Sequence, residues 1–154
     1  SGHDAVAAVK AIRDGRSKAL IALGGNLAVA MPDPEVTYPA MRSLDLVVHI
    51  ATKLNRSHLL IAKESIILPC LDRTEIDVQA SGKQLVTGED SMSMVHGSRG
   101  GLKPASEHLK TEAMIVADMA AATLPNNVGK RHDLGAEDSK IRDASEGVVA
   151  AFKD

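Results

Sequence analysis

The sequence predicts an α/β fold built on a mostly parallel sheet. Three short apolar runs, at 18–23, 46–50 and 65–68, each follow a stretch whose apolar residues have helical spacing. This alternation is typical of βαβ units, in which consecutive strands lie side by side and parallel. The nearly continuous apolar character of the run at 18–23 favours a strand that is buried on both faces, and the run at 46–50 is expected to be a second buried strand. We therefore expect a single domain over residues 1–154, a length that can bury one core.

Local signals place the helices of the first half. Apolar residues at helical spacing predict a helix over 3–14, which Gly15 is expected to end. Asp33 is a favourable cap for a helix over 34–44, because Pro34 suits the first helical position. A further short helix is predicted over 55–62.

The second half is less regular. Residues 73–104 are polar and rich in glycine, with one strand-like stretch at 84–87, and so long a segment indicates a binding loop or a surface that another part covers. An amphipathic helix is predicted over 106–124, and a linker over 125–135 precedes a last helix over 139–152. The chain thus comprises a βαβ core, an irregular segment and C-terminal helices, at residues 1–71, 72–104 and 105–154.

Composition argues against several classes of function. The net charge of −2 provides no basic field for nucleic acid or an anionic membrane. The lone Cys70 excludes an intrachain disulfide framework and a zinc cluster of several thiolates. With no Trp, one Tyr and one Phe, the chain has few aromatic surfaces on which bases stack. No apolar run spans a membrane and the first residues lack the pattern of a secretory signal, so we expect a soluble, cytoplasmic protein without nucleic-acid or membrane partners.

The loop after the first strand is a candidate binding site, because open parallel sheets bind ligands beyond the carboxyl ends of their strands. Gly24 and Gly25 lack Cβ atoms and expose main-chain amides to a phosphate or a ring edge, and Asn26 adds a donor and an acceptor. The alternative is a turn that needs glycine only for its backbone conformation. A third glycine is missing and no acidic residue ends the next strand, so an ordinary NAD site is disfavoured.

The loop after the second strand is denser in polar groups. Its polar residues are Thr52, Lys53, Asn55, Arg56, Ser57 and His58. Two cations among hydrogen-bonding groups suit a phosphate and a purine edge. The alternative is a helix that Asn55 or Ser57 caps, with Lys53 and Arg56 in solvent.

The remaining reactive side chains are interpreted as structural, apart from His96, which is a candidate ligand contact. His49 lies within a buried strand and is expected to be a core residue. Cys70 has no base beside it in sequence and is expected to be an inert, partly buried thiol. Two acidic pairs are expected to be solvated or capping groups, Glu75 with Asp77 and Glu89 with Asp90. No catalytic residue and no metal ligand is predicted, because no nucleophile, base and orienting group can be identified by spacing.

One string of the chain, Thr-Lys-Leu-Asn-Arg-Ser-His-Leu at 52–59, is highly specific. It stands in order with shorter strings at 22–26, 32–33, 67–71, 73–75, 84–92, 95–96, 104–106 and 141–143. Together they resemble the molybdopterin-dependent oxidoreductase alpha subunits related to formate dehydrogenase. The resemblance covers nearly the whole chain.

The resemblance implies that the chain is an internal piece of a protein several times longer. Such proteins hold molybdenum or tungsten between two molybdopterin guanine dinucleotides, and they carry an iron-sulfur cluster, which would lie outside this chain. The chain would be a three-layer α/β/α, Rossmann-like domain that clasps one dinucleotide and packs against the remaining domains. It would be inactive alone. The full-length enzyme would perform a two-electron redox step at the metal, with formate as the default substrate and an electron-transfer partner.

The resemblance also assigns cofactor contacts by position. The loop of Gly24, Gly25 and Asn26 would face the pterin and pyrophosphate, and residues 52–58 would serve the phosphate or guanine end. The side of the cofactor would be lined by Glu75, Asp90 and Ser91. The family's metal-coordinating and cluster regions are absent from this chain, so Cys70 is not a metal ligand. His132 stands where the family has a Trp.

Two other functions remain open. The chain is alternatively a free-standing nucleotide-binding or regulatory domain that uses another dinucleotide. It is alternatively a protein-interaction module whose docking loop lies at 82–101. On the cofactor hypothesis, residues 82–101 are expected to be mobile when no cofactor is bound.

Overall fold

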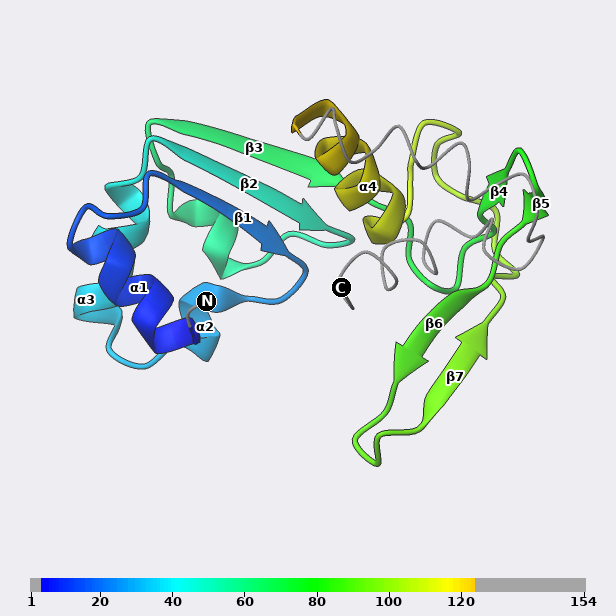
Figure 1. Ribbon diagram of the computed structural model, residues 1–154, viewed down its shortest axis with the longest axis horizontal. Coiled ribbons are helices and arrows are strands. Elements are labelled where there is room, and N and C mark those ends of the chain that lie inside the picture. The colour runs from blue at the N-terminus through cyan, green and yellow to red at the C-terminus, as the bar shows by residue number, and fades with distance from the viewer. Residues whose placement is uncertain (1–3, 124–154) are drawn as a thin grey trace. The chain divides into compact units, whose positions relative to one another are not determined.

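A computed structural model describes residues 4–123 of the chain. The chain divides into two compact units, the first at 1–69 and the second at 70–154. Each unit is described by itself below, with its elements labelled as in Figure 1.

The first unit is built on a three-stranded parallel sheet. Its strands are β1 (Ala19–Leu23), β2 (Leu46–Ala51) and β3 (Glu64–Pro69), which lie in the order β1-β2-β3. The register places Ile21 beside Val48 and Val48 beside Ile66. The predicted α/β class and parallel pairing are confirmed for this unit, since the three apolar runs form its three strands.

Four helical segments connect and cover these strands. They are α1 (Ala5–Arg13), α2 (Leu27–Ala30), α3 (Pro34–Arg42) and the 3-10 turn η1 (Arg56–Leu59). The side chain of Asp33 accepts a hydrogen bond from the Val36 amide at 3.3 Å, as expected of the cap of α3. The single-turn α2 was not predicted, and the predicted helix over 55–62 is shortened to η1.

The core of this unit lies between the sheet and the helices. Val9 and Ile12 of α1 cluster with Ala40 of α3 and Val47 of β2. Helices α1, α2 and α3 lie together on one face of the sheet (Figure 1). Within residues 4–69 the structure therefore shows one helical layer on the sheet, which is compatible with the predicted class and leaves the three-layer arrangement open.

Burial of the strands differs from the expectation. Residues 47–50 of the central strand β2 are all buried, as predicted for this strand. In β1, however, burial alternates along the strand, and Ile21 and Leu23 are each 52% exposed. Strand β3 is exposed along most of its length. The prediction that the run at 18–23 is buried on both faces is wrong, because β1 is an edge strand and its alternate side chains are exposed.

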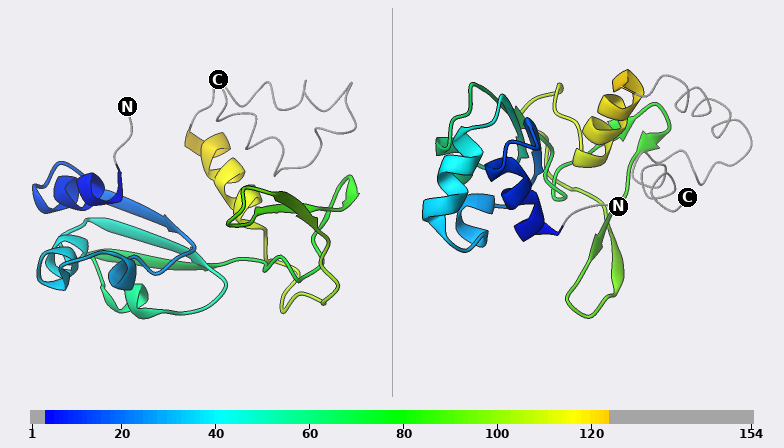
Figure 2. Two further views of the ribbon diagram at one scale, coloured as in Figure 1. Left: turned by 90° about the horizontal axis from the view of Figure 1, so that it is seen from below. Right: turned by 60° about the vertical axis from the view of Figure 1, so that its left-hand side comes forward.

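The second unit contains two antiparallel hairpins and a helix. The hairpins are β4 (Val78–Gln79) with β5 (Gly82–Lys83), and β6 (Val86–Glu89) with β7 (Val95–Ser98). The β6–β7 hairpin is an extended two-stranded ribbon in Figure 1 and in the right view of Figure 2. The irregular segment predicted over 73–104 is thus partly wrong, because short strands there pair across tight turns.

Helix α4 (Glu112–Thr123) begins six residues later than the predicted start at Ser106. Thr111 precedes the helix, and its hydroxyl accepts a hydrogen bond from the Met114 amide at 3.3 Å, as a helix cap does. Only Ile115 is buried, and apolar residues surround the helix instead of forming one stripe, so the predicted amphipathic face is wrong. The predicted linker and last helix, over 125–135 and 139–152, lie outside the described residues. Every helix within 4–123 is too short or too polar to cross a membrane.

Two chain segments of the second unit run side by side and pair in parallel at Glu75 and Leu102, and this contact is called the crossing below. The amide of Ile76 donates to the Leu102 carbonyl at 2.8 Å, and the amides of Gly101 and Leu102 donate to the Thr74 carbonyl at 2.9 and 3.0 Å. Gly100 lies so close to this crossing that an added Cβ would stand 1.7 Å from the Glu75 carbonyl oxygen. The crossing therefore requires glycine at position 100.

Candidate functional site

The first loop of the site continues the pairing of β1 with β2. The Gly24 amide donates to the Ile50 carbonyl at 2.8 Å, and then the chain turns through positive φ angles of 59° at Gly24 and 66° at Gly25. Such φ angles favour glycine. A Cβ added to Gly25 would meet nothing within 4 Å, so the main chain of the loop is open on that side.

The second loop runs from the end of β2 into η1. Asn55 caps η1, because its side-chain oxygen accepts a hydrogen bond from the Ser57 amide at 2.9 Å. The Asn55 amide in turn donates to Nδ1 of His58 at 2.9 Å, which completes a reciprocal capping box. The alternative interpretation of this loop, a helix that Asn55 or Ser57 caps, is confirmed for Asn55.

Three hydrogen bonds join the second loop to the first loop and to α2. Nδ2 of Asn55 donates to the Gly25 carbonyl at 2.8 Å. The Ser57 hydroxyl accepts from the Ala28 amide at 2.9 Å and donates to Oδ1 of Asn26 at 3.0 Å. The two loops, at 24–26 and 52–58, therefore lie together at one edge of the sheet. This is expected, because they follow two adjacent parallel strands.

Cationic and hydroxyl side chains surround this joint. Thr52, Lys53 and Arg56 are exposed. The ion pairs found within residues 4–123 include neither Lys53 nor Arg56. No carboxylate occurs within 24–26 or 52–58. The edge is therefore locally positive, although the whole chain is slightly negative.

Two histidine rings are in contact, one from β2 and one from η1. The centroids of His49 and His58 are 4.6 Å apart with the rings tilted by 41°. Burial, and then the charge of His58, lower the pKa of His49 below its ordinary value, which favours a neutral ring. Nε2 of His58 is buried without a hydrogen-bond partner within the described part of the chain. His49 is buried in β2, as predicted of a core residue.

The other three predicted contacts lie in the second unit, where their interactions are local. The Glu75 carboxylate accepts from the Asp72 amide at 2.9 Å. Asp90 accepts from the amides of Met92 and Met94 at 2.8 and 3.1 Å and thus shapes the turn between β6 and β7. Ser91 is exposed in that turn. These contacts give each residue a structural role within its own unit and leave its predicted contact with a cofactor untested.

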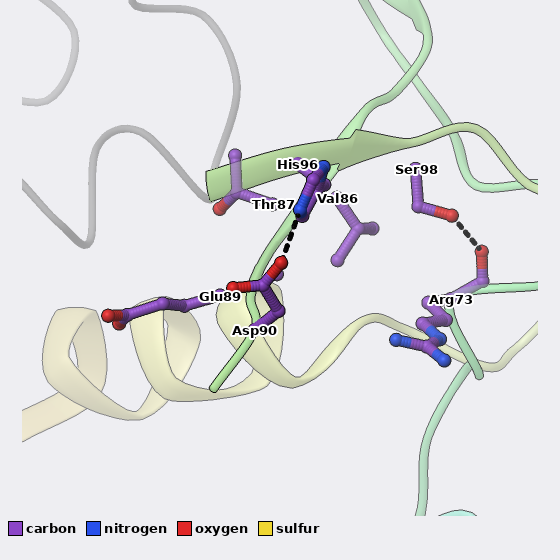
Figure 3. Close-up of a pocket in the computed structure, with 8 residues that line it drawn as sticks. Arg73, Val86, Thr87, Glu89, Asp90, His96 and Ser98 are labelled. Atoms are coloured by element: carbon purple, nitrogen blue, oxygen red, sulfur yellow. Dashed lines mark hydrogen bonds and ion pairs between the residues drawn. The ribbon is translucent and has the colours of Figure 1, made fainter. Parts of the chain in front are cut away.

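A small pocket of about 110 Å³ lies on the β6–β7 hairpin (Figure 3). Nε2 of His96 and Oδ2 of Asp90 form a hydrogen bond at 2.8 Å on one side of it, and the Ser98 hydroxyl donates to the Arg73 carbonyl at 3.3 Å on the other. The His96 bond holds the pKa of Asp90 below its usual value. Most of the lining is exposed, and Ser98 is engaged with Arg73 instead of His96, so the pocket does not assemble a nucleophile with its base. Within residues 4–123, no group of three or more metal-binding side chains is clustered for an ion.

The sequence-based interpretation missed how Ser57 is used. It was included among the polar residues of the second loop, but it is 2% exposed and lies inside the joint. Its partner at Ala28 is 29 residues away in an unpredicted helical turn. A buried serine in an otherwise exposed polar string carries no local signal of such a role.

Relatives of the chain are known. Protein YdeP of Shigella flexneri is 53% identical over 153 residues, which are 99% of this chain and 20% of that protein. Protein YdeP of Escherichia coli strain K12 is 52% identical over 153 residues, which are likewise 99% of this chain and 20% of that protein. Uncharacterized oxidoreductase Rv2900c of Mycobacterium tuberculosis is 45% identical over 154 residues, again 99% of this chain and 20% of the relative. No protein-family model matches the chain. The chain spans about a fifth of the length of these relatives.

Proposed function

We propose that the chain is a cofactor-binding part of a longer oxidoreductase and holds the nucleotide portion of one molybdopterin guanine dinucleotide. The observation that carries this proposal is the bonded pair of loops after β1 and β2. It brings an open glycine main chain, an oriented carboxamide and two exposed cations to one edge of the sheet. That edge is where open parallel sheets bind nucleotides.

The chemistry of the donor set suits a phosphorylated ligand. Lys53 and Arg56 carry positive charge, Thr52 offers a hydroxyl, and no carboxylate of either loop opposes an anion. Arginine and lysine are the common partners of phosphate oxygens. The phosphates would be held by residues 24–26 and 52–56. The bound cofactor would supply two-electron redox chemistry at its metal, and formate is the substrate that we propose for the full-length enzyme.

The relatives support the coarser part of the proposal. The Mycobacterium tuberculosis relative is named an oxidoreductase and is 45% identical over 99% of the chain. Since the chain spans 20% of that relative, a longer parent protein would supply the metal ligands, the rest of the cofactor site and an electron-transfer partner. It would also supply a second helical layer, which would cover the half-exposed Ile21 and Leu23 and complete a three-layer domain.

Comparison of GDP with guanosine tests the proposal on the chain itself. We expect calorimetry to show that GDP binds more tightly than guanosine, because the site contacts phosphate. Substitution of both cations, Lys53→Gln with Arg56→Gln, should weaken GDP binding about tenfold, which corresponds to about 1.4 kcal/mol. The matched control is Lys10→Gln, an exposed lysine on α1 outside both loops.

Three results would contradict the proposal. Equal affinities for GDP and guanosine would show that phosphate is not recognised. An equal loss in the Lys10→Gln control would show a nonspecific charge effect. Tighter binding of NAD than of GDP would favour a free-standing domain for another dinucleotide.

A further inference from the structure

The carboxamide of Asn26 has one orientation that satisfies its surroundings. Ser57 is buried, and its hydroxyl oxygen already accepts the Ala28 amide, so its single proton needs an acceptor. Oδ1 of Asn26 provides that acceptor at 3.0 Å. If the carboxamide were reversed, its NH2 group would donate to the hydroxyl and the buried Ser57 proton would lose its acceptor.

The main chain of Ser57 is held independently. Its amide donates to Oδ1 of Asn55 at 2.9 Å, and Nδ2 of Asn55 donates to the Gly25 carbonyl at 2.8 Å. A backbone amide only donates and a carbonyl only accepts, so the orientation of the Asn55 carboxamide is fixed by its two partners. The position of the Ser57 main chain therefore does not depend on its contact with Asn26.

The opposite end of the Asn26 carboxamide faces away from this joint. Among the described residues, Nδ2 of Asn26 makes no hydrogen bond to the protein. The buried side-chain atoms without a hydrogen-bond partner in this part of the chain are Nε2 of His58 and Oε1 of Gln84, and Nδ2 of Asn26 is not one of them. Asn26 is partly exposed, so within the described part of the chain its NH2 group is open to a ligand beside the main chain of Gly25.

We infer that Ser57 is a positioning residue that turns the NH2 group of Asn26 toward the ligand, so that the site requires a phosphoryl oxygen as the acceptor at this point. The inference rests on the proposed function for the identity of the ligand. It adds specificity, because a fixed NH2 group rejects a ligand that presents a donor or a cation there. Ser57 itself does not touch the ligand.

A double-mutant cycle tests whether Ser57 acts through Asn26. We expect Asn26→Ala to weaken GDP binding about tenfold and Ser57→Ala to weaken it about three- to tenfold. In the Asn26→Ala background, Ser57→Ala should cause no further loss, because the group that it orients is already gone. Ser57→Thr keeps the hydroxyl and should retain most of the affinity. Losses that multiply in the double variant would overturn the inference.

A second readout does not require ligand binding. In the free protein, NMR relaxation of the Asn26 side-chain NH2 group should show an ordered group, which becomes mobile in Ser57→Ala and ordered again in Ser57→Thr. Fluorescence of Tyr38, the chain's one tyrosine in the absence of tryptophan, shows whether each variant keeps the first unit folded. An NH2 group that is mobile in the unmutated protein, or equally ordered in folded Ser57→Ala, would overturn the positioning role. If the unmutated protein binds GDP no better than guanosine, the choice of phosphate fails together with the proposed function, whereas the relaxation result still decides the role of Ser57.

Discussion

Cys70 shows how burial and charge act together on one side chain. The thiol is 4% exposed. Burial, and then the negative charges of Glu112, Asp72 and Glu75, together raise its pKa to about 11. A thiol reacts as its thiolate, and at neutral pH the thiolate is scarce here. The sequence predicted a partly buried thiol, and the structure shows a fully buried one.

We expect Cys70 to react slowly with a thiol reagent such as DTNB at pH 7.5 in the native protein. It should react at least about tenfold faster in guanidinium chloride, where both burial and the neighbouring charges are removed. Because the chain has one cysteine, the colour change reports this thiol alone. Equal rates in the native and denatured protein would contradict the buried position.

His49 makes the stability of the first unit depend on pH. Its pKa in the fold is lowered, so on acidification the unfolded chain binds a proton before the folded one does. The contribution of His49 to the free energy of unfolding should therefore be constant above about pH 6.5. It should fall as the pH drops below that value. Denaturant titrations followed by Tyr38 fluorescence at pH 7.5 and 5.5 measure this fall.

The variant His49→Gln should show a smaller fall between these two pH values, whatever its absolute stability. His108→Gln is the matched control, because the His108 side chain is 88% exposed and lies in the second unit. If His49→Gln and the unmutated protein lose the same free energy on acidification, the buried histidine does not cause the pH dependence.

Some side-chain roles were predictable at this scale and others were not. Asn55 was predicted as a cap because the cap, its amide partner and its histidine partner lie within three residues of one another. The role of Ser57 depends on Ala28 and Asn26, which the fold brings to it from about thirty residues away. Local sequence carries the first kind of contact and not the second.

At the scale of elements, the capping box of η1 gives a matched pair of variants. His58→Ala removes the acceptor for the Asn55 amide and should lower the free energy of unfolding of the first unit by about 1 kcal/mol. His58→Gln should recover part of this loss, because glutamine accepts that bond in other capping boxes. Tyr38 fluorescence during denaturant titration compares the two. Equal losses would show that the imidazole acts by packing on His49 and not by its hydrogen bond.

Gly100 and Gly101 give a second matched pair, in the second unit. A Cβ at position 100 would collide with the Glu75 carbonyl, whereas one at 101 would meet nothing within 4 Å. Gly100→Ala should therefore destabilise the unit by about 1–3 kcal/mol and Gly101→Ala by much less. The denaturant concentration at which Cys70 becomes reactive reports this unit. Equal shifts in the two variants would contradict the close approach.

Elements were predictable where local sequence decides them. The runs that form β1, β2 and β3 are apolar enough to be recognised, and Gly15 ends α1 with a φ of 71° as expected. The β6–β7 hairpin was missed at its correct position because its strands are polar and its turn depends on bonds to Asp90. The start of α4 was displaced because Thr111, and not Ser106, provides the cap.

At the scale of the whole molecule, the site belongs to the first unit and the other predicted contacts belong to the second. The class of the fold and the edge of the sheet that holds the site could be predicted, because both follow from the order of helices and strands. Burial of the edge strands could not, because it depends on what covers them. Glu75, Asp90 and Ser91 were assigned to the site by resemblance alone, and their observed contacts are local.

A residue-resolved titration of the labelled chain with GDP, followed by ¹H–¹⁵N NMR, tests the central proposal most directly. We expect the shift changes to concentrate at 24–26 and 52–58, to include the Asn26 side-chain NH2 group, and to be much smaller with guanosine. Changes that are the same for GDP and guanosine, or that map to the pocket at 86–98 instead of the two loops, would contradict it.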